Sequence, residues 1–393
     1  MNSAMMRLPW TLDSVPHAVL DILRGCNIRC RDCFNSRPNR IKPLAEIETE
    51  LEMLLRLRRL QSVTILGGEV TLHPQLAQIV RMVRRHGLDV ELCSNGVDLS
   101  DKLLSELRAA GANVILLHIE PHQQRPDLPA SASVSDLRAL RVAIAERVVA
   151  HGIEAGLSVT VYPDRLAELE ETISFTLATP QINYLLVTLW RDIGAVPELT
   201  GNLTDGLRAE AAVARHADKM TNRDVQAFME QKFGLSPFAY VASNVDATDP
   251  RWLSYLVGIV YQHGSPLRQH CLRATRVEKW FLEISRRMKG RYPFYQRHTA
   301  GRFAVQLLLN GLAGGGLSRN LKLIAQSWRG TATLSSKKLL FQCPATVNER
   351  GQVLHCDCCP DAVLQNGKLV PVCISDRFSG APNTDTFYAY TVY

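Results

Sequence analysis

Six short apolar runs, rich in β-branched residues, alternate with segments of helical periodicity along the first half of the chain. The runs cover residues 18–24, 62–69, 89–96, 113–120, 154–162 and 183–191. Strands that alternate with helices pair in parallel and bring their carboxyl ends, where functional groups gather, to one edge of the sheet. The pattern therefore predicts an α/β fold, an incomplete barrel of six strand–helix units within residues 1–195.

Helical patterns fill the gaps between these runs. Residues 45–60 carry apolar side chains at helical spacing, which predicts a helix that packs on the sheet. These side chains are Ile47, Leu51, Leu54 and Leu55. Three later patterns end at a glycine, the residue that most often follows a helix. These glycines are Gly87, Gly111 and Gly152.

The second half of the chain lacks this alternation. Residues 196–338 predict a mostly helical region that shapes the substrate site, and its segment 285–330 mixes Arg and Lys with aromatic and apolar residues. Residues 339–393 predict a small extension of short strands, rich in cysteine, with turns at 349–351 and 366–367. We therefore expect three parts: a barrel, a helical region and a cysteine-rich extension.

Composition limits the ligands and the cellular location expected for this chain. The net charge is +7, but Arg is spread along the sequence, which favours an anionic ligand or surface only weakly. No run approaches the roughly 18 apolar residues of a membrane span, and the N-terminus lacks a signal-peptide pattern. We expect a cytoplasmic protein without a transmembrane segment. The first strand begins within twenty residues of Met1, so we expect no N-terminal peptide-recognition domain.

The ten cysteines are the main chemical signal. In the reducing cytoplasm thiols stay free, so clustered cysteines indicate metal or redox chemistry. Three gather near the start of the chain and five near its end, which predicts two metal centres. These eight are Cys26, Cys30, Cys33, Cys343, Cys356, Cys358, Cys359 and Cys373. Cys93 and Cys271 stand alone, and we interpret Cys271 as an inert buried thiol.

The first cluster follows the first predicted strand directly. Cys26, Cys30 and Cys33 have C-x3-C-x2-C spacing within GCNIRCRDCFN. Three thiolates on a four-iron cluster leave one iron open for a ligand. A zinc site or buried thiols are the alternatives, but zinc usually takes four ligands and no fourth Cys or His lies nearby. The spacing therefore favours an iron–sulfur cluster with an open iron.

Two further motifs fall at the ends of the next two predicted strands. Gly67, Gly68 and Glu69 end the second run, and Ser94 and Asn95 end the third. Singly each would be an ordinary turn, but three motifs in order on successive strand ends are hard to obtain by chance. Together they make the chain resemble the radical S-adenosylmethionine (SAM) superfamily. The aromatic residue Phe34 follows the third cysteine, whereas it commonly precedes it in that family.

The resemblance implies roles for these residues. A 4Fe-4S cluster on the three cysteines would cleave SAM reductively to a 5′-deoxyadenosyl radical. The GGE motif would hold the SAM amino group, with Ser94 and Asn95 at its ribose or carboxylate. Glu120 would touch SAM or substrate, and Arg191 the SAM carboxylate. We interpret His118 as a satisfied core histidine. An electron donor such as flavodoxin or ferredoxin would be a partner.

The tail resembles the SPASM and twitch extensions of radical SAM enzymes, which carry auxiliary 4Fe-4S clusters. Five cysteines suffice for one complete cluster, so the shorter twitch-like form fits better. The predicted ligands are Cys343, Cys356, Cys359 and Cys373, with Cys358 as the spare or as the substitute for Cys359. A structural zinc site remains the alternative, since four thiolates in a loop-rich unit suit zinc equally well.

These inferences predict a radical SAM enzyme that modifies a small-molecule substrate by oxidation, rearrangement or carbon–carbon bond formation. Two enzyme alternatives stay open, a peptide-modifying maturase and a methyl- or adenosyl-transferring enzyme. A zinc-stabilised nucleic-acid-binding protein is the alternative from another class. It requires basic and aromatic residues near the cysteines, and the one candidate, 291–298, lies far from both clusters. We therefore expect no nucleic-acid partner.

Overall fold

The computed structural model describes residues 5–31, 33, 39–121, 123–129, 131–190, 220–295, 299–348 and 352–377. Its centre is one large open sheet whose strands follow the order β1-β10-β11-β13-β9-β8-β6-β5-β4-β2, with β12 paired to β11. Within the described chain its two ends, β1 and β2, do not pair with each other. The sheet is therefore an incomplete barrel, as expected from the sequence.

All six predicted parallel strands are present. They are β2 (His17–Asp21), β4 (Ser62–Leu66), β5 (Asp89–Ser94), β6 (Val114–Leu117), β8 (Glu154–Val161) and β9 (Ile182–Leu189). Each pairs in parallel with the next in this order. Because all six run the same way, the loops that follow them emerge at one edge, which we call the carboxyl edge.

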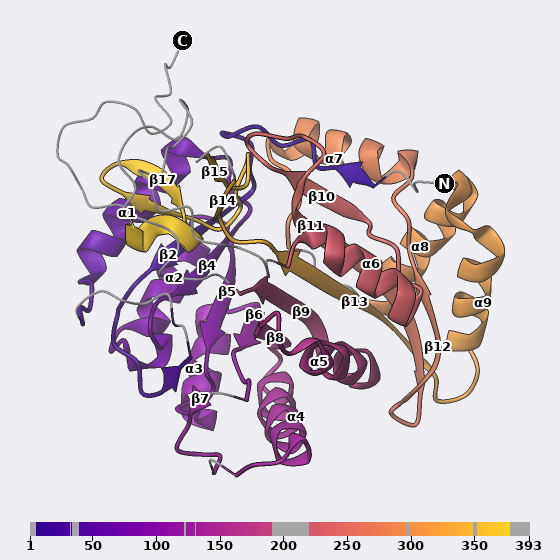
Figure 1. Cartoon of the computed structure of the whole chain (residues 1–393), viewed down its shortest axis with the longest axis horizontal. Coiled ribbons are helices and arrows are strands. Elements are labelled where there is room, and N and C mark those ends of the chain that lie inside the picture. Colours follow the sequence, from indigo (N-terminus) through magenta and orange to yellow (C-terminus); the bar gives the residue numbers. More distant parts are fainter. Residues whose placement is uncertain are drawn as a thin grey trace.

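The helices between these strands cover the outer face of the sheet, along the left and lower side in Figure 1. They are α1 (Leu44–Leu57), α2 (Leu76–Arg85), α3 (Asp101–Ala110), α4 (Val134–Ala150) and α5 (Leu166–Ala178). Ser100 caps α3 through the Leu103 amide, and Gly111 follows it with φ of 103°. A left-handed residue at this position explains the glycine stop predicted there.

The middle of the chain corrects the expectation of a mostly helical region. It holds helices α6 (Asn222–Phe233), α7 (Arg276–Lys289), α8 (Ala300–Asn310) and α9 (Leu317–Ser327), with a π-helical turn at Gly311–Gly315. It also holds strands β10 (Ala239–Ala242), β11 (Pro250–Gln262), β12 (Ser265–Cys271) and β13 (Thr333–Gln342). These strands were missed because β11 is buried almost throughout, so its sequence does not alternate between apolar and polar residues.

Strand β13 decides where the end of the chain lies. It pairs in parallel with β9 and antiparallel with β11. Its carboxyl end, and Cys343 beyond it, therefore emerge at the same edge as the loops after β2, β4 and β5. At the far side of the sheet, β1 (Met6–Arg7) pairs in parallel with β10.

The cysteine-rich tail forms two short hairpins, as predicted. They are β14 (Thr346–Val347) with β15 (Val353–Leu354), and β16 (Ala362–Gln365) with β17 (Lys368–Pro371). The second hairpin turns at Asn366 and Gly367, both with positive φ, which fits the predicted turn. The turn predicted at 349–351 lies outside the described residues. A short 3-10 helix, Val372–Arg377, follows, and β16 contacts β2 and α1. The tail thus lies beside the free edge strand (Figure 1).

The helices of the described residues are all too short or too polar to cross a membrane.

One buried lysine joins β13 to the barrel, and burial lowers its pKa to about 7. Lys337 is 0% exposed, and its Nζ donates to the carbonyl oxygens of Thr179 at 2.6 Å, Pro180 at 3.3 Å and Ile182. These carbonyls lie between α5 and β9. The ammonium group therefore satisfies backbone acceptors that would otherwise be buried without donors.

We expect Lys337→Met to lower the free energy of unfolding by about 1–3 kcal/mol, because the buried carbonyls lose their donor. Urea denaturation measures the change. Lys102→Met, at an exposed position of α3, is the matched control and should stay within about 0.5 kcal/mol of the parent. Equal effects of the two substitutions would contradict the role given to Lys337.

Candidate functional site

The loop after β2 carries the first three cysteines. Within it, the two-residue strand β3 (Arg29–Cys30) pairs with β7 (Gln123–Gln124), which fixes Cys30 against the loop after β6. The Tyr162 hydroxyl donates to the Arg31 carbonyl at 3.1 Å, and the Arg31 guanidinium lies 4.7 Å from the centre of that ring. Cys26 and Cys33 are exposed and Cys30 is partly buried. The loop is thus anchored from two neighbouring strands while its thiols remain accessible.

The glycines of the GGE motif pack against this loop. A Cβ atom at Gly67 would lie 2.3 Å from the Leu23 carbonyl oxygen, and one at Gly68 would lie 2.0 Å from the Gly25 carbonyl oxygen. The Gly68 amide donates to Leu23 at 2.8 Å, and the Glu69 amide donates to Gly25 at 2.8 Å. Only glycine fits at such an approach. The two glycines therefore hold the cysteine loop against the end of β4.

Glu69 connects the ends of β4 and β5. Its side chain accepts hydrogen bonds from the Thr71 hydroxyl at 2.7 Å, the Thr71 amide at 3.1 Å, the Ser94 hydroxyl at 2.7 Å and the Asn95 amide at 2.6 Å. The residue is 1% exposed. That Glu69 binds the SAM amino group stays a prediction. The structure gives this carboxylate a positioning role that the sequence did not indicate.

Asn95 faces the thiol of Cys26. Its Nδ2 lies 3.8 Å from Cys26 Sγ and 2.6 Å from Asn27 Oδ1. Burial raises the pKa of Cys26, and the charges of Glu69, Cys30 and Cys33 raise it further, so the three thiols influence one another. Ser94 and Asn95 were predicted to contact SAM. Their positions next to Cys26 are compatible with that prediction, which no contact in the structure tests.

His118 and Glu120 form an ion pair behind the cysteine loop. His118 Nε2 lies 3.1 Å from Glu120 Oε1, and Glu120 Oε2 accepts the Thr160 amide at 2.8 Å. Burial lowers the pKa of His118, but the charge of Glu120 and hydrogen bonds to Glu120 and Cys30 outweigh it and raise that pKa well above its usual range. His118 has partners at both ring nitrogens, Glu120 and the Ser158 carbonyl oxygen, and its interpretation as a satisfied core histidine stays a prediction. The residue lies between a predicted cluster ligand and a predicted SAM or substrate contact.

A cavity of about 590 Å³ opens at the carboxyl edge, and we call it the carboxyl-edge cavity. It brings together most of the predicted site residues. These are Cys26, Cys30, Cys33, Gly67, Gly68, Ser94, Asn95, Glu120, Cys343, Cys356, Cys359 and Cys373. Trp190 also lines it, whereas the predicted SAM contact Arg191 lies outside the described residues. Both cysteine clusters thus border one space, although more than 300 residues separate them in sequence.

The five C-terminal cysteines fall into two groups by position. Cys343, Cys356, Cys359 and Cys373 line the cavity, which agrees with their choice as ligands. Cys358 points elsewhere: its Sγ donates to the Trp10 carbonyl at 3.4 Å, and burial raises its pKa to about 12. A hydrogen bond between Cys356 and Cys359 raises the pKa of Cys359, with burial and the charge of Cys373 adding to it.

Arg251, on β11, is a neighbour of this second cluster that sequence analysis missed. It is 3% exposed, and its guanidinium donates to the carbonyls of Pro344 and, at 3.1 Å, Leu354. Burial lowers the pKa of Arg251, but the charges of Cys343 and Cys356 outweigh this and raise it. A buried cation beside four thiols stabilises their thiolate form, which is the form that binds metal. No local pattern marks Arg251, because its contacts come from distant strands.

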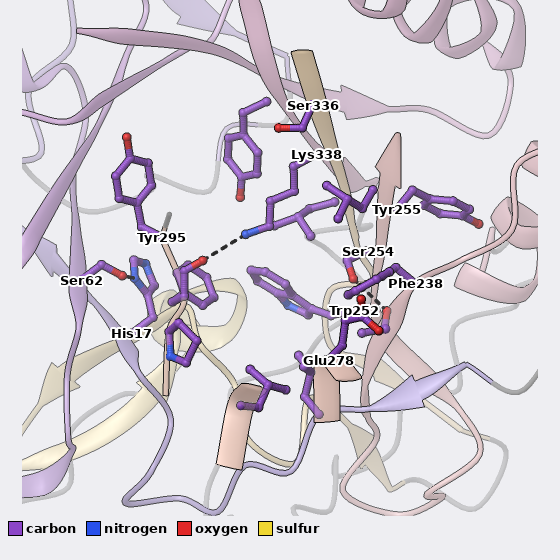
Figure 2. A pocket seen from close by; sticks show the side chains of 18 of the residues that line it. His17, Ser62, Phe238, Trp252, Ser254, Tyr255, Glu278, Tyr295, Ser336 and Lys338 are labelled. Carbon is purple, nitrogen blue, oxygen red and sulfur yellow. Dashed lines mark hydrogen bonds between the residues drawn. The ribbon is translucent and has the colours of Figure 1, made fainter. Parts of the chain in front are cut away.

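A second cavity, of about 240 Å³, lies near the amino ends of the barrel strands, and we call it the amino-end cavity. Figure 2 shows His17, Trp252 and Lys338 on its wall. Five residues line both cavities. These are His17, Glu91, Tyr184, Trp252 and Phe294. The two cavities therefore share a wall of titratable and aromatic side chains, and we call this part of the barrel interior the passage.

The polar groups of this passage are paired with one another. The Thr64 hydroxyl donates to Glu91 Oε1 at 2.8 Å and lies 3.0 Å from His17 Nε2. The Lys338 ammonium donates to the Phe294 carbonyl at 3.3 Å and lies 5.0 Å from the centre of the Phe294 ring. Burial raises the pKa of Glu91 to about 7 and lowers that of Lys338. The Glu91 carboxyl group is therefore partly protonated near neutral pH.

Among the described residues, no three Cys, His, Asp or Glu side chains converge as in a preassembled metal site. The donor chemistry nevertheless fits iron–sulfur clusters, because both sets consist of thiols and both border an open cavity. Cys26, Cys30 and Cys33 are the residues that would hold the first cluster. The Cβ-free surface of Gly67 and Gly68 borders the same space.

The comparisons with known proteins agree with this geometry. The family model of the radical SAM superfamily matches residues 20–176, which include all strand ends of the first site up to Glu120. Residues 20–176 belong to the radical SAM superfamily. This membership implies a 4Fe-4S cluster and SAM as cofactors, and it explains why the three motifs occupy successive strand ends.

Individual radical SAM proteins are similar over part of the chain. The tungsten-containing aldehyde ferredoxin oxidoreductase cofactor-modifying protein of Pyrococcus furiosus is 24% identical over 168 residues, which are 40% of this chain and 47% of that protein. The PqqA peptide cyclase of Gluconobacter oxydans is 29% identical over 41% of this chain and 46% of its own. The chain spans about half the length of these curated relatives. Streptococcus suis SuiB bound to S-adenosylmethionine overlaps 45% of this chain and 41% of its own, at 17% identity and a TM-score of 0.35.

The two arrangements of the C-terminal cysteines predict different iron contents. Cys359→Ser should remove about four irons per chain from the anaerobically purified protein, because Cys359 lines the cavity with the other three ligands. Cys358→Ser should retain them, because Cys358 faces Trp10. Iron analysis and the visible spectrum measure both variants. Loss of iron from Cys358→Ser alone would reverse the assignment, and zinc in place of iron would identify a structural zinc site.

The raised pKa of Glu91 predicts a pH dependence. The usual pKa of 4.5 rises to about 7 on folding, so the native state binds more protons in this window and its stability falls as the pH rises through about 7. His17 has the opposite sign: burial lowers its pKa to about 3, so its contribution is present above 6.5 and is lost as the pH falls through about 3.

Glu91→Gln should therefore gain stability relative to the parent between about pH 4.5 and pH 7 and above, because Gln cannot ionise in the passage. Urea midpoints at several pH values measure the difference. An infrared titration of the protonated carboxyl band should lose one component near pH 7 that the variant lacks. Asp361 also titrates, at about pH 6, and is cancelled in this subtraction because both proteins contain it. A parent and variant with parallel pH profiles would contradict the assignment.

Proposed function

We propose that this chain is a radical SAM enzyme that modifies a substrate bound inside the barrel, between the two groups of cysteines. The observation that carries the proposal is the single cavity of about 590 Å³ bordered by Cys26, Cys30 and Cys33 and by four C-terminal cysteines. Its volume is in the range of small-molecule sites. A molecule in this space would lie next to the first cluster on one side and the C-terminal thiols on the other.

The cluster and SAM would supply a 5′-deoxyadenosyl radical, and the chain would supply binding, orientation and exclusion of water. Asn95 donates toward Cys26, and Glu69 holds the Asn95 backbone in place. The His118–Glu120 ion pair presents a protonated imidazole toward Cys30. Hydrogen-bond donors near cluster sulfur atoms change the reduction potential of the cluster. These residues are therefore proposed to set that potential and to position SAM.

The passage beyond the cavity is proposed to bind the substrate. Glu91 and Lys338 offer hydrogen-bonding groups of both signs, while Tyr184, Trp252 and Phe294 offer aromatic surfaces. Such a lining suits a compact molecule with polar and apolar parts. We propose a small-molecule substrate, an electron donor such as flavodoxin or ferredoxin, and a cytoplasmic location.

A peptide substrate is the second candidate, because one relative is a PqqA peptide cyclase. The two candidates differ in what the purified enzyme consumes. Incubation with SAM and reductant, with a candidate precursor peptide or with a metabolite extract, followed by mass spectrometry, identifies the substrate that changes in parallel with SAM cleavage. Consumption of a peptide encoded beside this gene would overturn the small-molecule proposal but would leave the radical chemistry intact.

The C-terminal thiols are proposed to hold an auxiliary 4Fe-4S cluster. Arg251 supports this proposal, since its charge compensates thiolates in a buried position. A cluster at this wall of the cavity would be placed to bind substrate or to accept an electron from it. Radical transfer of a methyl or adenosyl group is distinguished by its products, because hydrogen abstraction releases 5′-deoxyadenosine and adenosyl transfer does not.

Replacing Cys26, Cys30 and Cys33 together by Ala should abolish 5′-deoxyadenosine formation while about four irons remain per chain, since the C-terminal thiols are untouched. Anaerobic assays with dithionite and iron analysis measure both quantities. Cys271→Ala, a cysteine at the end of β12 that lines neither cavity, is the control and should keep the cleavage activity. Continued SAM cleavage by the triple variant would refute the proposed function.

A further inference from the structure

Helices α7, α8 and α9 carry an unusual amount of exposed apolar surface. Of the eighteen large apolar side chains that are exposed among the described residues, eleven lie on 280–328. They are Trp280, Phe281, Ile284, Met288, Val305, Leu308, Leu309, Leu312, Leu317, Leu321 and Trp328. Single exposed apolar residues are ordinary, but a concentration of this kind marks an interaction surface. We call these eleven side chains the apolar helix face.

The exposed residues follow the helical repeat within each helix. On α7, Trp280, Ile284 and Met288 are spaced by four and are 68%, 53% and 80% exposed. The buried side of the same helix consists of Glu278 and Ser285. On α8 and the π-helical turn after it, the exposed positions 305, 308, 309 and 312 lie opposite the buried residues 303, 307 and 310. The apolar stripes are therefore ordered features of folded helices.

The three helices are packed together and sit at one end of the molecule, in the upper right of Figure 1. Asn310 at the end of α8 donates to Glu278 on α7 at 2.9 Å, and Asn320 on α9 donates to the Leu307 carbonyl of α8 at 2.8 Å. Phe303 of α8 and Leu323 of α9 belong to one buried apolar cluster. The stripes are thus held in fixed positions relative to one another.

Positive charge surrounds the apolar helix face. The segment 273–329 contains twelve Arg and Lys residues and two Glu residues, in a chain whose net charge is only +7. The two acidic residues are engaged locally: Glu278 caps α7 through Thr275, and Glu283 pairs with Arg286 at 3.3 Å. Ten cations on these helices or beside their ends are exposed, and they are Arg273, Arg276, Lys279, Arg286, Arg287, Lys289, Arg302, Arg319, Lys322 and Arg329.

We propose that the apolar helix face docks this protein on the surface of an anionic lipid bilayer. Apolar side chains flanked by Lys and Arg on amphipathic helices are the pattern of interfacial binding, in which the helices lie in the plane of the headgroups. Exposed Trp side chains favour the same depth. A second copy of the chain is a poor occupant, because it would bring two sets of like charges together. The inference does not depend on the proposed radical chemistry.

The docking surface adjoins the interior of the barrel. Glu278, Phe281 and Leu282 of α7 line the amino-end cavity, and Phe281 is also 50% exposed on the apolar helix face. The labelled Glu278 marks this wall in Figure 2. A bilayer in contact with α7 would therefore lie next to the amino-end cavity, which shares a wall with the carboxyl-edge cavity. Docking would place the passage within reach of amphipathic molecules in the membrane.

Cosedimentation of the anaerobically purified full-length protein with vesicles tests the proposal. We expect binding to phosphatidylcholine vesicles that contain phosphatidylglycerol, weak binding to phosphatidylcholine alone, and release by high salt. Met288→Glu/Leu312→Glu and Arg286→Glu/Arg287→Glu should each weaken binding by about tenfold or more. Val134→Glu is the matched control, because Val134 is 56% exposed on α4, away from this face, and should bind as the parent does.

Other occupants give different results. Absence of vesicle binding by the parent protein would overturn the proposal, as would equal loss of binding in Val134→Glu. A concentration-dependent dimer that Met288→Glu/Leu312→Glu dissociates, without vesicle binding, would identify a second copy as the occupant. A large fall in melting temperature in that variant alone would show that the face is covered within the chain.

Discussion

The buried carboxylate of Glu69 is the interaction on which the first site depends. It accepts hydrogen bonds from the residues that follow β4 and from those that end β5, so it fixes two strand ends with one side chain. The same connection places the Asn95 amide beside Cys26. Since Gly68 and Glu69 also donate backbone hydrogen bonds to the cysteine loop, the loops after β2, β4 and β5 form one unit. We expect a substitution at any of these positions to change the position or surroundings of the cysteine thiols.

The second constraint is the direction of β13. Because this strand runs parallel to β9, residues more than 300 positions from the first cysteines arrive at the same edge of the sheet. An antiparallel pairing here would have carried Cys343 to the opposite end of the barrel. The connection through β11 makes the parallel direction possible, since β11 enters the sheet antiparallel to its neighbours on both sides. The long middle region therefore brings the second set of thiols to the first.

The sequence predicted what local patterns encode. The six parallel strands, the helix stops and the strand-end motifs depend on periodicity and on residues close in the chain, and all six strands were recovered. The residues that were missed act across the fold. Lys337 donates to carbonyls 155 to 158 residues away, and Arg251 contacts the tail about a hundred residues later. Such side chains have no local signature, because only the pairing of strands gives them partners.

The long strand β11 shows why apolar content alone misleads. Its thirteen residues include WLSYLVGIVYQ, which lacks alternation because both faces of the strand are covered. One face contributes Trp252, Ser254 and Leu256 to the interior cavities, while Val257 and Ile259 on the other face pack in the main core. Helices α8 and α9 lie against this part of the sheet with their buried sides, which leaves their other sides to solvent. A sheet covered by only one layer of helices must either make the outer helix surface polar or bring it against another apolar phase, and this chain has kept it apolar and surrounded it with cations.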